Sequence, residues 1–392
     1  MNYLIQAYAC SSYQGGEYAV SWGWITHLSQ AVSCKDKIYV VSLTLTQKEL
    51  DDNNLKNIKL LKVKGMEKYN FLNYNQIYYK IWQKKAYFMV KKLKIDLDVV
   101  HVYSLSDFRQ PGDWYKIKNT YTILGPVGGG QICPASLISY DDMSGKIRQF
   151  INWFCKNDPL FRKKIGKFAR VYACNRETQK YLKNAEILPD VPLNDSLKNL
   201  KIIKREHKVR TILYVGRLIN KKGLKLLLDV LDYIDSNITY QVLIYGEGDQ
   251  RDILEDIITK KKLEDKVFLK GKVPYNEISK TYQEGDIFVL PSLRESGGSV
   301  LIEAMAHQLP IVALDMSLAH LLNQKKCGMF VNINQKKEGV LKQFANILMK
   351  LLSNSELREF YGNNGYRYVN QELTWDNMID EVYGEFIKKE RC

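Results

Sequence analysis

The sequence lacks any long apolar run. It has no stretch of about 18 or more consecutive apolar residues, the least that a membrane-crossing helix needs. The amino terminus also lacks the basic segment and apolar run of a secretory signal. We therefore expect neither a transmembrane helix nor an export signal, and residues 3–9 predict a first β-strand instead.

Cysteine is scarce as well. There are seven, an odd number, and none of them is in a C-x-x-C pair. Disulfide frameworks use even numbers of cysteines and many structural zinc sites use paired ones, so we expect reduced thiols in a cytoplasmic protein. We expect these thiols to act as small apolar fillers, with the last one on a loose chain end. They are Cys10, Cys34, Cys133, Cys155, Cys174, Cys327 and Cys392.

Basic residues are in excess, and mostly in the first half. The net charge is +15; residues 1–200 hold 29 Lys and Arg against 17 Asp and Glu, and residues 201–392 hold 29 against 26. Such an asymmetry is typical of proteins that bind nucleic acid or an anionic membrane, and also of proteins that are merely rich in lysine. The sequence shows no aromatic-basic RNA motif and no recognition-helix pattern, so we expect no nucleic-acid partner.

The length and the order of predicted elements indicate two α/β domains. A chain of 392 residues that is 45% hydrophobic can bury two cores. Predicted strands alternate with helices, as in doubly wound parallel sheets. Strands are predicted at 3–9, 37–43, 99–103, 120–124, 211–215, 240–245, 267–269, 287–290 and 311–314. Pro189, Pro192 and the polar run 194–208 indicate a linker between the halves.

The stretch 291–306 contains the most informative group of candidate binding residues. Glu295 and Glu303 lie on either side of paired glycines, Gly297 and Gly298, between a predicted strand and a helix predicted at 299–307. A glycine-rich turn into a helix offers backbone N–H groups and a positive dipole end, which suit a phosphate. Two flanking carboxylates could accept hydrogen bonds from hydroxyls on both sides of a diphosphate, as in a nucleotide-sugar. Strand–Gly-Gly–helix turns also occur without a ligand, so this pattern alone leaves both interpretations open.

Two cations follow the predicted strand at 211–215. Gly216 and Arg217 come directly after it, and Lys222 opens the next helix. The carboxyl ends of parallel strands are where α/β sheets bind ligands. An Arg fork and a Lys point charge both suit diphosphate oxygens, although each alone could be an ordinary surface cation.

Together these motifs resemble retaining glycosyltransferase family four, which has the GT-B fold. The carboxyl half carries Gly216-Arg-Leu, Lys222-Gly, Tyr245-Gly-Glu-Gly248 and the Glu295–Glu303 stretch. In the amino half, Gln14-Gly-Gly-Glu-Tyr-Ala-Val-Ser-Trp22 resembles the glycine loop after that family's first strand. The stretches 124–131 and 173–178 resemble a branch that makes surface polysaccharides. The motifs match in order over nearly the whole chain.

The resemblance implies two Rossmann-like, doubly wound parallel-sheet domains that face each other across a cleft. Residues 1–196 would form an acceptor-binding domain and 210–370 a donor-binding domain, joined by a linker at 197–209. Residues 371–392 would form a helix that crosses back onto the first domain. The cleft would close on the nucleotide-sugar.

The resemblance also implies roles for the site residues. Glu295 would bind hydroxyls of the donor sugar, and Glu303 the ribose of the nucleotide. Arg217, Lys222 and backbone N–H groups around Gly298, Ser299 and Val300 would neutralise the leaving diphosphate, without a metal or other cofactor. The departing phosphate would take the proton of the acceptor. Gly15 and Gly16 would let the first domain's backbone approach the phosphates closely, and Gly216 would belong to the donor site.

Two further motifs are ambiguous. Many family members carry a histidine after the fourth strand, close to the donor sugar. His101 lies there, but the common His-x-His and His-His patterns are absent and Tyr103 occupies one of those places. It is a candidate catalytic residue, although a lone histidine at a strand end is more often structural. Asp96-Leu-Asp98 has the Asp-x-Asp pattern of the metal site of the other main glycosyltransferase fold. Because it leads into a buried strand, we expect it to have a structural role.

The function that follows is sugar transfer from a nucleotide-diphosphate sugar to a lipid-linked glycan, in capsule or exopolysaccharide assembly at the cytoplasmic face of the membrane. The sugar, the linkage and the nucleotide (UDP, GDP or dTDP) stay open. A nucleotide-sugar epimerase and a non-catalytic assembly partner with the same fold are the alternatives. A glycoside hydrolase is disfavoured, because its two carboxylates must face each other across the scissile bond.

The first half also has basic amphipathic stretches with aromatic residues. One apolar face is formed by Tyr78, Trp82, Ala86, Met89 and Leu93; a second by Ile147, Phe150, Ile151 and Phe154, and continued by Phe161, Ile165 and Phe168. Such a helix can lie on an anionic bilayer. Alternatively, its apolar face packs on the core while the lysines meet water, which is the simpler interpretation for any single helix. For the domain as a whole, the charge excess leaves peripheral membrane binding open.

Overall fold

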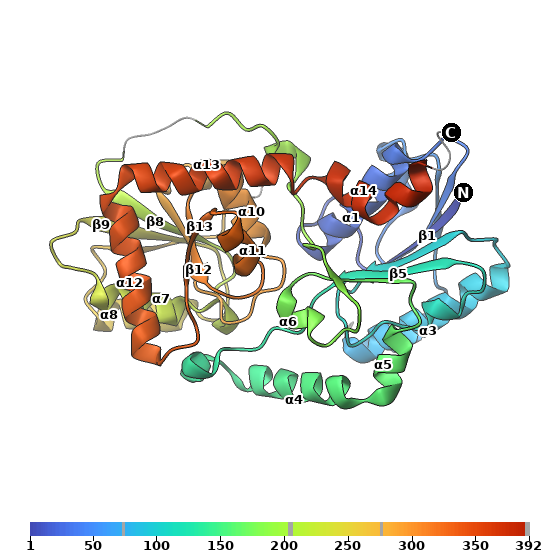
Figure 1. Cartoon of the computed structure of the whole chain (residues 1–392), viewed down its shortest axis with the longest axis horizontal. Helices are drawn as coiled ribbons and strands as arrows, with labels where there is room; N and C mark the ends of the chain where they lie inside the picture. Colours follow the sequence, from blue (N-terminus) through green and yellow to red (C-terminus); the bar gives the residue numbers. More distant parts are fainter. Residues whose placement is uncertain (73–74, 203–206, 275–276, 389–392) are drawn as a thin grey trace. The chain divides into compact units, whose positions relative to one another are not determined.

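The computed structural model describes residues 1–72, 75–202, 207–274 and 277–388. The chain forms two compact units (Figure 1). Residues 1–130, 151–191 and the chain from Trp375 onward form the first unit, and residues 131–150 and 192–374 form the second. The predicted first domain, residues 1–196, included 131–150 and 192–196, which belong to the second unit. Part of the predicted linker, residues 203–206, lies outside the described residues.

The first unit is built on a seven-stranded parallel sheet in the order β3-β2-β1-β4-β5-β6-β7. Its strands are β1 Asn2–Ala7, β2 Lys37–Val41, β3 Ile58–Leu61, β4 Val99–Ser104, β5 Tyr121–Val127, β6 Arg170–Ala173 and β7 Glu186–Ile187. Its helices are α1 Glu17–Ala31, α2 Gln47–Asp52, α3 Gln76–Leu93, α5 Pro159–Ile165, α6 Arg176–Gln179 and α14 Trp375–Lys388. Successive residues of a strand point to opposite faces of the sheet. Accordingly, Leu4 belongs to one buried cluster and Tyr3 and Ile5 to the other.

The second unit has a six-stranded parallel sheet in the order β10-β9-β8-β11-β12-β13. Its strands are β8 Arg210–Val215, β9 Tyr240–Tyr245, β10 Val267–Gly271, β11 Ile287–Leu290, β12 Ile311–Leu314 and β13 Gly328–Val331. Its helices are α7 Leu224–Val230, α8 Arg251–Lys260, α9 Ile278–Tyr282, α10 Ser299–Ala306, α11 Ala319–Gln324, α12 Lys337–Ser353 and α13 Ser355–Gln371. Helix α4, Met143–Asn157, has its first residues in the second unit and its last in the first.

Two parallel, doubly wound sheets confirm the predicted fold class, while the cleft between the domains stays a prediction. In each sheet the strand order reverses once, at β1/β4 in the first unit and at β8/β11 in the second. Ligands of doubly wound proteins bind at the carboxyl ends of the strands at such a reversal. We therefore expect ligand-binding residues in the loops after β1, β4, β8 and β11.

Short 3₁₀ turns complete the elements. They are η1 Glu67–Leu72, η2 Trp114–Lys116, η3 Ala135–Tyr140, η4 Asp195–Leu197, η5 Asn220–Lys222 and η6 Leu231–Tyr233. In the described parts of the chain, no helix combines the length and the apolar character that crossing a bilayer requires.

The last helix, α14, packs against α1 in the first unit (Figure 1). Trp375 stacks on His27 with the ring centroids 4.8 Å apart and meets Trp24 edge-on at 5.5 Å. A Cβ on Gly23 would lie 2.0 Å from the Trp375 ring, so the small residue in α1 makes room for the indole. Tyr383 of α14 is fully buried in the same cluster. These contacts make α14 part of the first unit's core.

Two details of the fold bear on the sequence predictions. Asp98 accepts a 2.7 Å hydrogen bond from the backbone N–H of Asn2, which pins the start of β4 to β1, so this aspartate has a structural role. Cys10, Cys133 and Cys327 are buried without a disulfide, as expected for apolar fillers, whereas Cys34 is exposed. Cys392 lies outside the described residues.

Candidate functional site

The candidate site lies in the second unit, where β8 and β11 are neighbours. The two strands run parallel, with Ile212 beside Ile287 and Leu213 beside Phe288, so both end at the same edge of the sheet. The loop after β8 carries Arg217 and Lys222, and the loop after β11 carries Glu295 and the paired glycines. Topology therefore gathers residues that lie more than 70 positions apart in the sequence.

The centre of the site is an ion pair between the Lys222 Nζ and the Glu295 Oε2. Both side chains are largely buried, with 12% and 15% of their area exposed. Glu295 also accepts hydrogen bonds from the Ser292 hydroxyl at 3.2 Å and from the Ser296 N–H at 3.3 Å. Burial raises the pKa of Glu295, but Lys222, Lys221 and Ser292 together outweigh burial and hold that pKa below its usual value. Glu295 is therefore ionised at neutral pH and accepts hydrogen bonds.

Backbone contacts hold the two loops together. The Leu293 N–H donates to the Lys221 carbonyl at 2.9 Å. Gly223 has φ +71°, and a Cβ there would lie 2.0 Å from the Pro291 carbonyl oxygen. A side chain at this position is therefore excluded both by backbone conformation and by space. The glycine that follows Lys222 lets the β8 loop close onto the β11 loop, which brings Lys222 to Glu295.

Helix α10 begins at the end of the β11 loop. Its N-cap is Gly298, with φ +65°, and no side chain caps the helix there. Gly297 and Gly298 are buried, while Ser299 and Val300 are half-buried in the first turn. The first N–H groups of a helix have no partner within the helix and carry its positive dipole end. This turn has the form of an anion-binding site, close in sequence to Glu295.

Glu303 lies one turn further along α10. Its Oε2 accepts a 2.7 Å hydrogen bond from the hydroxyl of Tyr282, a fully buried residue of α9 that stacks on His307. Burial raises the pKa of Glu303, and the hydrogen bond from Tyr282 opposes this only in part. Tyr282 thus fixes the position of one carboxylate oxygen, a contact that the sequence motif does not reveal.

Arg217 is exposed, and its backbone is held from two sides. Its carbonyl accepts a 3.0 Å hydrogen bond from the Tyr214 hydroxyl. The next N–H, that of Leu218, donates to the Glu247 carbonyl at 2.9 Å. A Cβ on Gly246 would lie 1.8 Å from the Gly216 carbonyl oxygen, which explains a glycine in the Tyr245-Gly-Glu-Gly248 turn. This turn supports the loop that presents Arg217.

The remaining predicted site residues lie in the first unit. Gly16 is the N-cap of α1 with φ +65°, and a Cβ at Gly15 or Gly16 would meet no atom within 4 Å. The need for glycine at position 16 is therefore conformational, and this loop is open to an approaching group.

His101 is fully buried and its ring nitrogens are both engaged. Nδ1 lies 2.5 Å from the Tyr383 hydroxyl of α14, and Nε2 pairs with the Gly125 carbonyl. Trp24 packs edge-on against the ring at 5.2 Å. Burial lowers the pKa of His101 to about 4, so the ring is neutral at pH 7. The structure gives His101 a role in joining α14 to the sheet.

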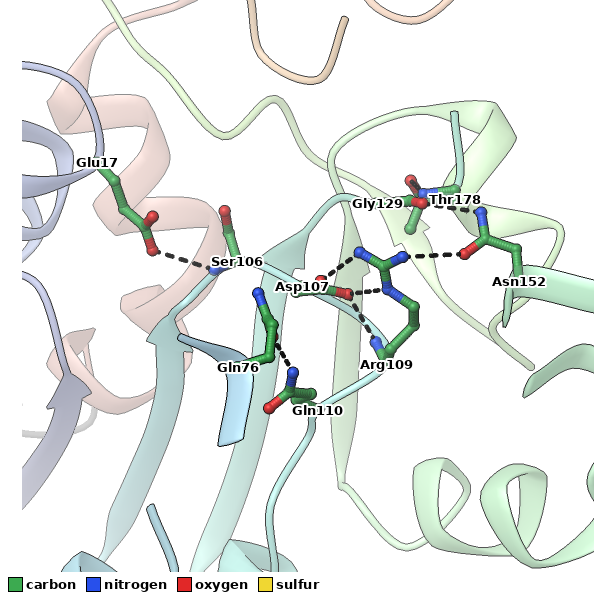
Figure 2. A network of polar contacts seen from close by, with 10 residues as sticks. Glu17, Gln76, Ser106, Asp107, Arg109, Gln110, Gly129, Asn152 and Thr178 are labelled. Carbon is green, nitrogen blue, oxygen red and sulfur yellow. Dashed lines mark hydrogen bonds and ion pairs between the residues drawn. The ribbon is translucent and has the colours of Figure 1, made fainter. Parts of the chain in front are cut away.

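Two further residues of chemical interest were not predicted from the sequence. Glu17 is largely buried at the start of α1 and accepts a hydrogen bond from the Ser104 hydroxyl at 2.9 Å. It also accepts one from the Ser106 N–H at 3.3 Å (Figure 2). Burial raises its pKa. The sequence could have indicated Glu17 as a candidate, because it directly follows the glycine loop.

The second missed residue is Arg294, which is 8% exposed and pairs with Asp141 at 3.0 Å and Asp142 at 3.2 Å. These contacts hold the residue before Glu295 against a segment about 150 positions earlier. Arg294 adjoins the motif in the sequence, but nothing local indicates its distant partners.

Comparisons with known proteins bear on the family and on the fold of the chain. Residues 195–368 match the family model described as "Glycosyl transferases group 1". The amylovoran biosynthesis glycosyltransferase AmsK of Erwinia amylovora is 34% identical over 161 residues, which are 39% of this chain and 38% of that protein. This chain spans about half the length of the curated relatives that it matches.

Two solved structures share the fold over nearly the whole chain. WaaG, a glycosyltransferase involved in lipopolysaccharide biosynthesis, has a TM-score of 0.59 at 16% identity, covering 97% of this chain and 100% of that one. A Staphylococcus aureus TarM mutant, in complex with Fondaparinux, alpha-GlcNAc-glycerol and UDP, has a TM-score of 0.63 at 14% identity, covering 98% and 99%. Residues 195–368 are therefore similar to the group 1 glycosyl transferases, and the two parallel-sheet units have the GT-B fold.

Proposed function

We propose that the protein transfers a sugar from a nucleotide-diphosphate sugar to a glycan acceptor, with retention of the anomeric configuration. The observation that carries this proposal is the Lys222–Glu295 pair, at the edge where β8 and β11 end and next to the start of α10. The group 1 family match favours transfer over an epimerase or a non-catalytic assembly partner. The UDP bound to the related TarM fold supports a nucleotide donor.

In this proposal the diphosphate lies at the start of α10, near Arg217 and Lys222. As the glycosidic bond breaks, its electron pair goes to the leaving phosphate oxygen, and the cations and N–H groups stabilise the growing negative charge without a metal. The departing phosphate takes the proton of the attacking acceptor hydroxyl. Glu295, which is ionised, accepts hydrogen bonds from the donor sugar, and Glu303 accepts them from the ribose.

We also propose that the acceptor is a lipid-linked glycan of surface polysaccharide assembly, bound by the first unit on the cytoplasmic side of the membrane. The name of AmsK, a glycosyltransferase of amylovoran biosynthesis, supports this setting. The open loop at Gly15 and Gly16, followed by the largely buried Glu17, supports a binding role for the first unit.

A thermal-shift screen with UDP-, GDP- and dTDP-sugars in the presence of EDTA tests the donor site. We expect one nucleotide class to raise the melting temperature of the wild type. Lys222→Ala and Glu303→Gln should weaken that response by roughly tenfold or more in apparent affinity, because each removes a charge from the site. Glu356→Gln, which changes an exposed carboxylate at the start of α13, should bind like the wild type.

The proposed donor site is wrong if no nucleotide-sugar shifts the melting temperature of the wild type. Binding that appears only after a divalent metal is added would retain the donor but overturn the metal-independent mechanism.

A further inference from the structure

Helix α4 carries its apolar side chains on the outside of the protein. We define the outer face of α4 as Met143, Ile147, Phe150, Ile151, Trp153 and Phe154, which are all exposed. Residues 143, 147, 150 and 154 follow the helical repeat and share one side of the helix. Phe150 is 66% exposed and Phe154 58%. An interior position for this face, the simpler interpretation of the sequence, is therefore wrong for α4.

Polar contacts fix the orientation of α4, beside the partly buried Cys155 that packs against the apolar core. Asn152 is fully buried. Its amide nitrogen donates to the Gly129 carbonyl at 2.9 Å, and its amide oxygen accepts from Arg109 at 3.5 Å (Figure 2). Arg109 is itself held by Asp107, with the Nε 2.8 Å from the carboxylate. Turning the helix to bury its aromatic side would break these bonds and leave buried polar groups unsatisfied, which is costly.

The exposed apolar residues of the molecule are concentrated in this region. Among the residues that the structure describes, seven of the 19 exposed large hydrophobic ones lie between positions 143 and 160: the six of the outer face and Leu160, which is 77% exposed at the start of α5. Single exposed hydrophobic residues are normal on protein surfaces, but a contiguous group of them indicates a binding surface. The clustering therefore requires a partner.

The charge around the outer face indicates which partner. Residues 143–170 contain eight Lys and Arg and one acidic residue, Asp158. The Asp158 carboxylate caps α5 by accepting a 2.9 Å hydrogen bond from the Leu160 N–H. Lys146 and Lys156 on α4, and Arg162, Lys163 and Lys167 just beyond it, are exposed. A second copy meeting this face symmetrically would set like charges against each other, whereas anionic lipid headgroups complement them.

We propose that the outer face of α4, together with Leu160, inserts into the interfacial layer of an anionic bilayer while the flanking cations bind lipid phosphates. Exposed aromatic and aliphatic side chains beside Lys and Arg are typical of helices that lie in the plane of a membrane surface. This docking does not depend on the donor site. It would bring the protein to the surface from which a lipid-linked acceptor is presented.

Vesicle flotation at low salt tests the proposal, with phosphatidylglycerol-containing vesicles compared with pure phosphatidylcholine. The wild type should float with the anionic vesicles only. The double variant Ile147→Ser/Phe154→Ser should lose roughly tenfold or more of its apparent partitioning, because two inserted apolar side chains are removed. The matched control Phe88→Ser/Leu93→Ser, which removes two exposed apolar residues from α3, should float like the wild type.

Substitution of the lysines beside the outer face gives a second test of the proposal. Lys146→Ala/Lys156→Ala should weaken partitioning by about fivefold per cation at low salt and flatten its salt dependence. The matched control Lys91→Ala/Lys92→Ala on α3 should change it less. Nucleotide-sugar binding should be unchanged in all four variants, which shows that they are folded and separates this test from that of the donor site.

Several results would overturn the proposal. The wild type could fail to bind anionic vesicles at low salt, or the α4 and α3 variants could behave alike. Self-association of the wild type without lipid, lost in Ile147→Ser/Phe154→Ser, would instead assign the outer face to a second copy of the chain.

Discussion

Helices α4 and α5 follow each other in the chain and have similar compositions, yet the apolar side of α5 is buried and that of α4 is exposed. Both place aromatic and aliphatic residues at helical spacing among Lys and Arg. In α5, Phe161 and Ile165 are buried, and Phe161 meets Phe108 edge-on at 6.0 Å. In α4 the corresponding apolar side is exposed. Apolar periodicity thus shows that a helix has two different faces, but it does not show which face is turned inward.

The deciding residue in α4 is polar. Asn152 faces a backbone carbonyl and the fixed guanidinium of Arg109, so that side of α4 finds hydrogen bonds inside the protein (Figure 2). In α5 the polar contacts lie at the helix start, where Asp158 serves as cap, and at Lys164, which pairs with Asp113, while the apolar side packs inside. A buried amide with ready partners can therefore outweigh an apolar stripe in choosing the inward face.

The largest expected effect is a difference in stability between two alanine variants, made at phenylalanines seven positions apart. Phe161→Ala should lower the free energy of unfolding by about 3 kcal/mol, since it empties a packed site. Phe154→Ala should change it by less than about 0.5 kcal/mol, since the ring is largely exposed. Urea unfolding measures both. Equal losses would show that α4 packs by its apolar side in solution.

An intermediate effect should come from Asn152→Ala. Removing this buried amide takes away its hydrogen bond to the Gly129 carbonyl and its contact with Arg109, at a cost of about 1–3 kcal/mol. Gln149→Ala, an exposed amide on the same helix, should be nearly neutral and serves as the control in the same unfolding experiment. A neutral Asn152→Ala would mean that something else orients α4.

The smallest effect concerns the ion pair that joins Asp113 to Lys164 of α5 at 3.1 Å. Burial raises the pKa of Asp113, but Lys164 and Lys116 outweigh burial and lower that pKa below its ordinary value. A lowered pKa contributes stability above the unfolded pKa, near 4, and that contribution is lost as pH falls through the folded pKa. Because the carboxylate is 39% exposed, Asp113→Asn should cost at most about 0.5 kcal/mol at pH 7.

Unfolding of wild type and Asp113→Asn, compared from pH 7 down to pH 3, measures this. The difference should begin to fall near pH 4 and disappear as pH falls through the lower folded pKa of Asp113, whereas Lys156→Ala on α4 should show no such dependence. A difference that stays constant from pH 7 to pH 3 would exclude the ion pair as its source.

Much of the fold was predictable because its strands are strongly patterned. The buried strands that became β1, β8, β9 and β11 were predicted to within about two residues of their observed ends, the precision expected at element boundaries. The short strands β3, β6, β7 and β13 were missed; unlike the equally short β11, which is buried throughout, each includes exposed or half-buried positions and so gives a weaker apolar signal. Of the two tryptophans of α1, Trp24 is the one that is fully buried, and Trp375 and His101 pack against it.

The candidate site was predictable where it is local. The glycines and glutamates of 291–306 form a contiguous motif, and the end of β8 is recognisable from Gly216 onward. What the sequence could not show is contact over distance. The Lys222–Glu295 pair, the Tyr282 bond to Glu303 and the Arg294 bonds to Asp141 and Asp142 all depend on the folded topology.

Gly223 has a consequence for how this protein can evolve. Its missing side chain lets the Pro291 carbonyl approach, and Pro291 opens the loop that holds Glu295. A mutation to any other residue would move both loops at once, and no single compensating change at Lys222 or Glu295 would restore their spacing. Codon 223 should therefore tolerate less variation among descendants than the codons for the charged residues that it aligns.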